Sequence, residues 1–189
     1  MFNRVIVSAV PIIVVLVLGS VLWQYDVMSN SDNSCVLTAE NPEGPYYVAG
    51  APQKEKIGEF LDGQRLIISG NILDDNCDPI PDAIVDIWQT DSNGEYYFKD
   101  FSLRGKVHAN ESGFYTVDTI FPGKYADGGQ FRPAHLHLKV SSPEGPPLTT
   151  QLYFAGDEHH DWLVKPSLIL ELNEMDGIKY AEFDFIITP

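Results

Sequence analysis

The hydrophobic pattern divides the chain into one continuous apolar run and a long series of short alternating segments. The run extends from Val5 to Leu22 without a charged residue. The segments behind it are separated by clusters of Gly, Pro, Asn and Asp. Alternation with a period of two is typical of strands that bury one face. The pattern therefore predicts an apolar N-terminal helix followed by an all-β body.

Six stretches of the body read as strands. They are residues 65–73, 83–90, 113–120, 131–140, 149–154 and 180–187. In the last stretch, Ala181, Phe183, Phe185 and Ile187 fall on one face of an alternating strand. Short strands joined by such turns predict an antiparallel β-sandwich, with a closed barrel as the alternative.

The N-terminal run has the length of a membrane span. Its uncharged residues would cross a bilayer as a helix, and Trp23 and Tyr25 after the run suit a membrane interface. We favour an uncleaved anchor, with a cleaved signal peptide as the alternative. Arg4 before the run favours a cytoplasmic N-terminus, which makes the body extracytoplasmic, either anchored or secreted.

Three regions follow from this interpretation. We expect a membrane anchor or signal segment at 1–25, a polar tether at 26–34 and a β-sandwich domain at 35–189. The formal net charge of −15 and the pI near 4.5 argue against nucleic acid and against anionic lipid headgroups as partners. Nothing in the sequence fixes the oligomeric state, and an oligomer is compatible with it.

The two cysteines of the chain, Cys35 and Cys77, predict a disulfide. Export to an oxidising compartment makes a bond between them the default. By the chain-entropy model such a bond stabilises the fold by about 4 kcal/mol. Two buried free thiols would be the interpretation for a cytosolic protein.

The strand "FRPAHLHLKV" carries the candidate chemistry. Residues i and i+2 of a strand share a face, so His135 and His137 lie together on the face opposite Leu136 and Leu138. Two imidazoles placed in this way can hold one metal ion, although the pattern also fits two solvent-facing histidines. The other histidines, His108, His159 and His160, read as exposed.

The remaining ligands of such a metal must come from elsewhere in the chain. Zinc would call for cysteines, and both are assigned to the disulfide. An iron site with two histidines and one carboxylate is compatible with the many Asp and Glu residues. Tyr96, after the "DSNG" turn, and Tyr125, after "FPGK", offer phenolate oxygens suited to Fe(III), although each also fits an ordinary aromatic at a strand end. Trp88 reads as a residue of the sandwich core.

Several motifs in order resemble the intradiol ring-cleavage dioxygenases, the catechol and protocatechuate dioxygenase family. They are "EGPYY" (43–47), "PIPDAIVDIWQTDSNGEY" (79–96), "RGKVHANESGFYTVDTIFPGKY" (104–125), "FRPAHLHLKV" (131–140) and "TTQLYF" (149–154). The resemblance implies Fe(III) held by Tyr96, Tyr125, His135 and His137. It also implies that Arg132 and Gln151 lie against the substrate, and that Tyr125 leaves the iron when the substrate binds.

The chain departs from the family at two places. Only "ADGGQF" separates Tyr125 from Arg132, which is shorter than in protocatechuate enzymes, and a tryptophan common after that tyrosine is absent. No N-terminal helical dimerisation region like that of the soluble catechol enzymes is visible. The chain therefore resembles the smaller secreted branch of the family.

The resemblance implies an enzyme that uses O2 to cleave a catechol between its two hydroxylated carbons, giving a cis,cis-muconate-type diacid. An exported β-sandwich binding module that keeps a metal site without turnover is the alternative. The ring substituents of the substrate are left open by the sequence.

Overall fold

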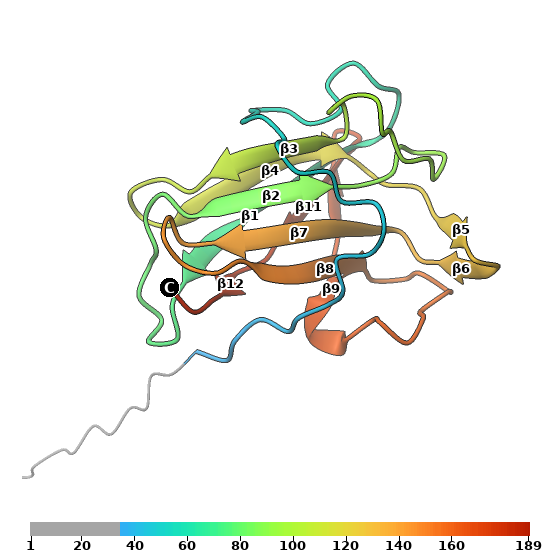
Figure 1. Cartoon of the computed structure of the whole chain (residues 1–189). Coiled ribbons are helices and arrows are strands. Elements are labelled where there is room, and N and C mark those ends of the chain that lie inside the picture. Colours follow the sequence, from blue (N-terminus) through green and yellow to red (C-terminus); the bar gives the residue numbers. More distant parts are fainter. Residues whose placement is uncertain (1–34) are drawn as a thin grey trace, which may run out of the picture. The chain divides into compact units, whose positions relative to one another are not determined.

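The computed structural model describes residues 35–189, which form two β-sheets packed face to face (Figure 1). The predicted anchor or signal segment at 1–25 and the tether at 26–34 lie outside the described residues. The strands are β1 (Arg65–Leu73), β2 (Ile84–Trp88), β3 (Arg104–His108), β4 (Phe114–Ile120), β5 (Tyr125–Asp127), β6 (Gln130–Arg132), β7 (His135–Ser141), β8 (Leu148–Phe154), β9 (Ile169–Leu170), β10 (Asn173–Met175), β11 (Ile178–Glu182) and β12 (Phe185–Ile186), with one 3-10 turn, η1 (Pro166–Leu168).

The first sheet is built around β1. One edge of β1 pairs with β4, and the other edge pairs with β11 and then with β12. The second sheet has the order β3-β2-β7-β8-β9, and its centre is the histidine strand β7. The hairpin of β5 and β6 belongs to neither sheet.

Alternating apolar residues of both sheets fill the space between them. Leu66 and Ile68 of β1 meet Val85 and Ile87 of β2 in one cluster, and each is at most 1% exposed. On β7 the same cluster takes Leu136, Leu138 and Val140. The histidines therefore lie on the outer face of the second sheet, as the alternation of that strand predicts.

The prediction of a β-sandwich is confirmed, but the prediction of purely antiparallel sheets is wrong. β11 and β12 run parallel to β1, and β9 runs parallel to β8. Two parallel neighbours need a long crossover connection between them, so a short turn cannot join them as it joins the strands of a hairpin. A pattern of short strands and turns reports hairpins and carries no signal for these pairings.

The stretch 180–187 also differs from its prediction as a single strand. It is divided between β11 and β12, with Phe183 and Asp184 between them. The Asp184 side chain accepts hydrogen bonds from the backbone and the side chain of Asn71, at 2.7 and 3.2 Å. The carboxylate thus replaces a ladder contact at the break, while the predicted apolar face stays buried at Ala181 and Phe185.

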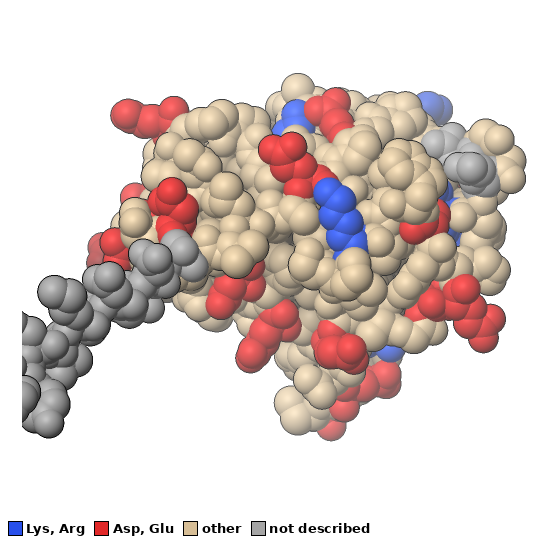
Figure 2. Space-filling model, turned by 90° about the horizontal axis from the view of Figure 1, so that it is seen from below, with Lys and Arg blue, Asp and Glu red and all other residues tan. Residues whose placement is uncertain are grey.

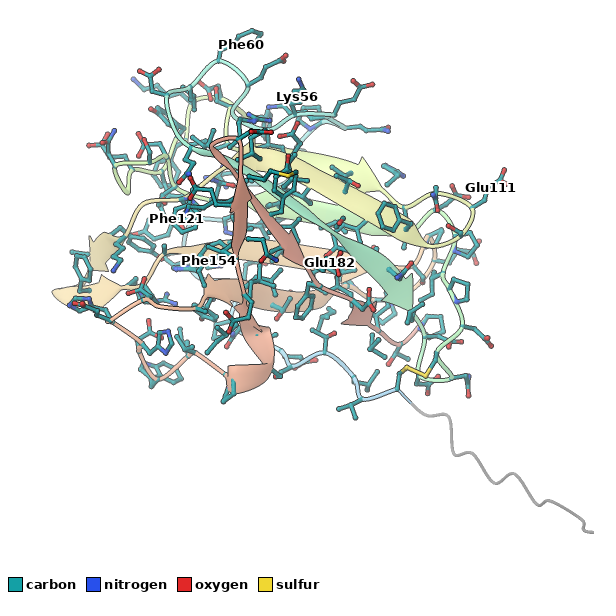
Figure 3. All side chains as sticks on the ribbon, turned by 180° about the vertical axis from the view of Figure 1, so that it is seen from behind. Lys56, Phe60, Glu111, Phe121, Phe154 and Glu182 are labelled. Atoms are coloured by element: carbon teal, nitrogen blue, oxygen red, sulfur yellow. A yellow bond between two sulfur atoms is a disulfide. The ribbon has the colours of Figure 1, made fainter. Side chains whose placement is uncertain are left out.

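Aromatic contacts extend the core at the edge of the sandwich. The rings of Phe121 and Phe154 lie 4.5 Å apart between centroids, and both labels fall in the same region of Figure 3. Phe60, in contrast, is 93% exposed and points away from the body in that view.

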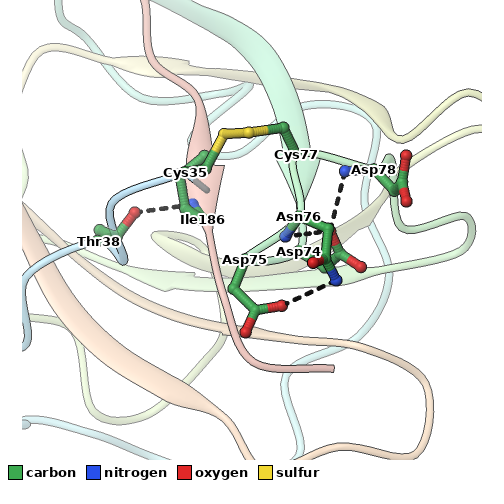
Figure 4. The surroundings of a disulfide bond; sticks show 8 residues. All are labelled: Cys35, Thr38, Asp74, Asp75, Asn76, Cys77, Asp78 and Ile186. Carbon is green, nitrogen blue, oxygen red and sulfur yellow. Dashed lines mark hydrogen bonds between the residues drawn. A yellow bond between two sulfur atoms is a disulfide. The ribbon is translucent and has the colours of Figure 1, made fainter. Parts of the chain in front are cut away.

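The structure contains the predicted disulfide between Cys35 and Cys77 (Figure 4). It ties the first described residue to the turn after β1. The Cys35 amide also donates a hydrogen bond to the carbonyl of Asp75, at 3.0 Å. The Asp74 side chain orders this turn by accepting hydrogen bonds from the amides of Asn76 and Asp78, both at 2.9 Å.

The surface reflects the acidic composition of the chain. Figure 2 shows Asp and Glu side chains spread over one face, with few Lys or Arg among them. Within residues 35–189, no helix is long and apolar enough to cross a membrane.

Candidate metal centre

The strand pairing places four predicted or newly found site residues in one row across the second sheet. Arg104 of β3 lies opposite Trp88 of β2, Trp88 lies opposite His137 of β7, and His137 lies opposite Gln151 of β8. Residues that oppose one another in neighbouring strands project from the same face. The outer face of this sheet is therefore the floor of the site.

A segment without regular secondary structure, residues 41–47, covers this floor and passes in front of the second sheet in Figure 1. A side chain at Gly44 would come within 3.4 Å of the His137 ring. Glu43 forms an ion pair with Lys139 at 2.5 Å, and Pro42 accepts a hydrogen bond from the Gln151 side chain at 2.8 Å.

The aromatic end of the same segment packs on the site residues. Tyr46 stacks on Tyr96 with 4.2 Å between centroids, and Tyr47 contacts the Trp88 ring edge-on at 4.8 Å. Because the segment covers their face, His135 and His137 are only 2% and 1% exposed. The alternative of two solvent-facing histidines is wrong for this strand.

A hydrogen bond fixes the tautomer of His135. Its Nδ1 lies 2.7 Å from the carbonyl oxygen of Pro133, and a carbonyl can only accept, so Nδ1 carries the proton. The lone pair of the neutral ring is then on Nε2. That nitrogen lies 3.1 Å from Nε2 of His137. Two nitrogens that bind one ion at about 2.1 Å each, at a right angle, are separated by about 3 Å.

Both predicted tyrosines lie beside this histidine pair. The Tyr125 hydroxyl is 3.4 Å from Nε2 of His135. The Tyr96 ring lies 5.2 Å from the Tyr125 ring and 6.4 Å from the His137 ring, between centroids. Tyr96 arrives from the loop between β2 and β3, and Tyr125 is the first residue of β5. The structure thus brings together all four residues that the sequence nominated as ligands.

Burial shifts the pKa values of His135, His137 and Tyr96 so that it favours their neutral forms. It lowers the pKa of His135 to about 4, and it lowers the pKa of His137 well below its usual range. Burial, followed by the neighbouring Tyr125, raises the pKa of Tyr96. Neutral imidazoles are the form that binds a metal, whereas the phenols need a nearby cation to ionise.

The unsatisfied polar atoms of the described chain collect at this place. In residues 35–189, the buried side-chain atoms without a hydrogen-bond partner are the Tyr96 hydroxyl, Trp88 Nε1, Arg104 Nη1 and His137 Nδ1. Such atoms are rare in folded proteins and call for a function. A cation accepts electron pairs from the Tyr96 oxygen and the paired Nε2 atoms, so the residues present fit a bound metal ion.

The side chains that could donate electron pairs restrict which metal ions would suit this site. Among the described residues, no group of three or more His, Cys, Asp and Glu side chains could hold an ion. The alternative with two histidines and one carboxylate therefore has no support in this part of the chain. Two imidazoles and two phenols remain, and anionic phenolate oxygen is a hard ligand suited to a trivalent ion.

Arg132 and Gln151 are joined in one hydrogen-bonded network next to the histidines. Arg132 donates from Nη2 to Oε1 of Gln151 at 2.9 Å, and its Nε forms an ion pair with Asp161. The hydroxyl of Tyr153 donates to the same Gln151 oxygen at 2.7 Å. These two partners, Asp161 and Gln151, hold the guanidinium in one orientation.

Two sequence interpretations need correction here. Trp88 is 1% exposed but does not belong to the core between the sheets, because it stacks on His137 with 4.9 Å between centroids. Val85 and Ile87 of the same strand face the core, so alternation places Trp88 on the outer face, and the register of β2 with β7 places it beside His137. Tyr96 was expected at a junction between a turn and a strand, but β3 begins only at Arg104.

Sequence reasoning missed several residues that shape the site. The 155–165 loop drew attention for His159 and His160, which are exposed, as is His108. The contributing residues of that loop are Asp157, which accepts a hydrogen bond from the Ala134 amide at 3.2 Å, and Asp161. In the sequence these two aspartates simply flank the histidine pair, and nothing in the local pattern indicates that they contact the site. Tyr46 stood inside the quoted "EGPYY" without an assigned contact.

A family model described as Dioxygenase matches residues 42–188. Among curated proteins, the chain is 34% identical over 146 residues to the catechol 1,2-dioxygenase of Pseudomonas sp. (strain EST1001), covering 65% of this chain and 48% of that protein. It is 30% identical over 174 residues to the chlorocatechol 1,2-dioxygenase of Pseudomonas sp. (strain P51), covering 77% and 68%. The chain thus spans about half the length of the first of these relatives.

Solved structures show the same likeness. The dioxygenase domain of a dioxygenase and carbohydrate-binding protein fusion from Streptomyces sp. SirexAA-E superposes with a TM-score of 0.75 at 31% identity, covering 81% of this chain and 99% of that chain. The 3-chlorocatechol 1,2-dioxygenase of Rhodococcus opacus 1CP gives a TM-score of 0.72 at 30% identity, covering 79% and 71%.

Proposed function

We infer from its place in the intradiol ring-cleavage dioxygenase family, to which the chain belongs, that the protein is a non-haem Fe(III) enzyme acting on catechols. In this proposal it uses O2 to cleave the ring between the two hydroxylated carbons and releases a cis,cis-muconate-type diacid. The relatives carry catechol or chlorocatechol in their names, which supports a catechol as the substrate class.

One observation carries the proposal. Two imidazole nitrogens lie 3.1 Å apart in a covered site, the Tyr125 hydroxyl lies 3.4 Å from one of them, and the Tyr96 ring lies beside both the Tyr125 and His137 rings. The proposed ligands are Tyr96, Tyr125, His135 and His137. When bound there, Fe(III) would supply Lewis acidity that lowers the pKa values of both catechol hydroxyls and makes the ring reactive toward O2.

The proposed role of Tyr125 is that of a base. A catechol must lose two protons to bind as a dianion, and the first leaves near the ordinary phenol pKa of about 10. A tyrosinate released from the metal would take one of them, and the other would pass to hydroxide. The hydroxyl of Tyr125 lies 3.4 Å from Nε2 of His135, so a released phenolate would be next to the proposed centre and could accept a proton from a catechol bound there.

The proposed role of Arg132 is electrostatic. Its ion pair with Asp161 and its hydrogen bond to Gln151 hold the guanidinium before the substrate arrives. A charge fixed in advance stabilises negative charge on the ring during oxygen attack without the cost of reorientation. Gln151 is itself fixed by Pro42 and Tyr153, so it supports the orientation of Arg132.

Colour, iron content and oxygen uptake test the proposal together. Tyrosinate bound to Fe(III) absorbs visible light, so protein expressed with iron should be reddish-brown and consume O2 with catechol. His137→Ala should lose both iron and colour and keep the fold, because it changes the outer face of β7. His108→Ala, at the exposed end of β3, is the matched control and should keep both.

Two outcomes would contradict the proposal. Full iron occupancy in His137→Ala would exclude the assigned ligands. A coloured, iron-loaded protein that consumes no O2 with any catechol in a panel of substituted rings would favour the alternative, an exported binding module without turnover. The same panel identifies the ring substituents that the site accepts.

We also propose that the domain works outside the cytoplasm. The uncharged run from Val5 to Leu22 and the disulfide between Cys35 and Cys77 support this location. N-terminal sequencing of the native protein distinguishes an uncleaved anchor from a cleaved signal. Two alkylatable thiols in freshly isolated native protein would contradict an oxidising compartment.

A further inference from the structure

Arg104 is a buried charge that the proposed reaction does not use. It is 2% exposed, although an isolated guanidinium loses much hydration free energy on burial. It stands in the row of the site, directly opposite Trp88 and one strand further from His137. One of its nitrogens, Nη1, has no hydrogen-bond partner in the described chain. A residue held at such cost calls for an explanation.

The bonds that Arg104 does make point to the Tyr96 loop. Its Nε and Nη2 both donate to the backbone carbonyl of Tyr97, each at 3.2 Å. A guanidinium presents these donors in a rigid planar fork, which an ammonium group cannot imitate. Arg104, the first residue of β3, therefore fixes the position of Tyr97, which follows Tyr96 in the chain.

A second anchor holds the same residue from the other side. The Tyr97 hydroxyl donates to Oδ2 of Asp91 at 3.2 Å, and Asp91 is 7% exposed. The other oxygen of Asp91 accepts the amides of Asn93 and Glu95, both at 2.9 Å. Tyr97 is thus held by its backbone at Arg104 and by its side chain at Asp91. Tyr96 lies between the Asp91-capped turn and the Arg104 contact.

We propose that Arg104 is a positioning residue that keeps the Tyr96 oxygen at the metal centre by clamping the Tyr97 carbonyl. The inference rests on the proposed function, because it takes Tyr96 as a metal ligand. It explains why a charge is retained at the edge of the site with two donors spent on one carbonyl. The loop carries Tyr96 outside any strand, so no ladder holds it, and these side-chain contacts act together with the Tyr46 ring that stacks on it.

The test compares iron retention and colour in the full-length, iron-loaded protein. The variants are Arg104→Gln, which breaks the fork, and Arg104→Lys, which keeps the charge without the fork. Arg65→Gln is the control, since Arg65 pairs with Asp118 on the first sheet, away from the histidines. The measurements are the rate of iron transfer to excess chelator and the position of the visible tyrosinate band, with thermal unfolding followed by circular dichroism.

We expect Arg104→Gln to lose iron about 10- to 100-fold faster than the parent and to shift or weaken the visible band. Arg104→Lys should fall between the two, and Arg65→Gln should match the parent. A purely structural role would lower the unfolding temperature and leave the band and the iron-transfer rate of the folded protein unchanged.

Each other outcome has a definite meaning. A folded Arg104→Gln with the parent's band and iron-transfer rate would overturn the inference and leave the proposed function intact. Failure of both Arg104 variants to fold would assign the residue to fold stability and overturn the inference as well. A colourless, iron-free parent would overturn the proposed function, and the inference with it.

Discussion

The Tyr96 segment (residues 91–104) and the Tyr125 hairpin (residues 125–132) each bring a phenol to the histidine pair, and they differ in what holds them. Tyr97 in the first segment is fixed by Asp91 and Arg104. Among the described strands, β5 and β6 of the hairpin form a ladder only with each other. Arg132 at the end of the hairpin is held by Asp161 and Gln151, whereas added side chains at its turn, Gly128-Gly129, would meet nothing within 4 Å.

The two segments nevertheless contact each other at their bases, where residues 91–94 meet residues 123–124; we call this contact the shared root. The Gly123 amide donates to the carbonyl of Asp91 at 2.7 Å, and Gly94 packs against the backbone of Lys124. The segments that carry the two phenols are therefore held together at the shared root, and different contacts restrain them beyond it. A phenol on a doubly anchored segment and a phenol on a hairpin outside the sheets are compatible with the proposal that Tyr125 would leave the metal and Tyr96 would stay.

The largest effect is expected from breaking the shared root with Gly94→Ala. Gly94 has φ +88°, and an added Cβ would lie 2.1 Å from the carbonyl oxygen of Lys124. Backbone strain and overpacking together should lower the free energy of unfolding by about 3 kcal/mol or more. Urea unfolding checks this expectation, and a loss below about 1 kcal/mol would show that the root is not rigid.

Removing each phenol in turn should separate the two segments functionally. We expect Tyr125→Phe to keep some iron and lose about 100-fold in turnover, mainly by slowing substrate chelation. Tyr96→Phe should shift the colour and leave the chelation step less impaired. Stopped-flow absorbance of anaerobic catechol binding distinguishes them, and chelation by Tyr125→Phe at the parent rate would exclude Tyr125 as the releasing base.

The histidine floor beneath both segments should respond to pH in the metal-free protein. The pKa of His135 is about 4 in the fold, against 6.5 ordinarily, so the unfolded chain binds more protons between these values. The stabilising contribution is full above pH 6.5 and is lost as the pH falls toward 4, by about 1.4 kcal/mol per pH unit for each such histidine.

Urea unfolding of the metal-free protein at several pH values measures this slope. His135→Asn should reduce the slope, whereas His108→Asn, at an exposed position, should leave it unchanged. An equal slope in the parent and in His135→Asn would contradict the assigned burial effect.

The smallest effect is expected at the free end of the hairpin. Gly128 has φ +57° with open space around it, so Gly128→Ala meets backbone strain without a clash. The loss of unfolding free energy should be about 1 kcal/mol. A loss as large as that of Gly94→Ala would mean that the hairpin is as firmly held as the Tyr96 segment, and the comparison would fail.

Sequence reasoning was most successful where one strand contained the whole signal. The stretch 65–73 coincides with β1, and the alternation of 131–140 placed Leu136 in the core and His137 on the other face. The family motifs nominated the tyrosines that the fold brings beside those histidines. In these cases period-two patterning or a local motif was sufficient.

The remaining features depend on pairings between distant strands. The stacking of Trp88 on His137 follows from the register of β2 with β7, and the bond from Arg132 to Asp161 follows from the path of a loop. The parallel pairing of β1 with β11 joins residues more than a hundred positions apart. Hydrophobic patterning describes faces within a strand and contains no information on these partners.

The disulfide also has a mechanical consequence. Cys35 and Cys77 close a covalent loop, with their Cα atoms 5.3 Å apart, and the 41–47 segment over the histidines lies inside it. A pull on the chain ahead of Cys35 is carried across the sulfur bridge to the turn after β1. The loop between the two cysteines cannot be drawn out while the bridge is intact. The bridge thus diverts tension applied ahead of Cys35 from the 41–47 segment that covers the histidines.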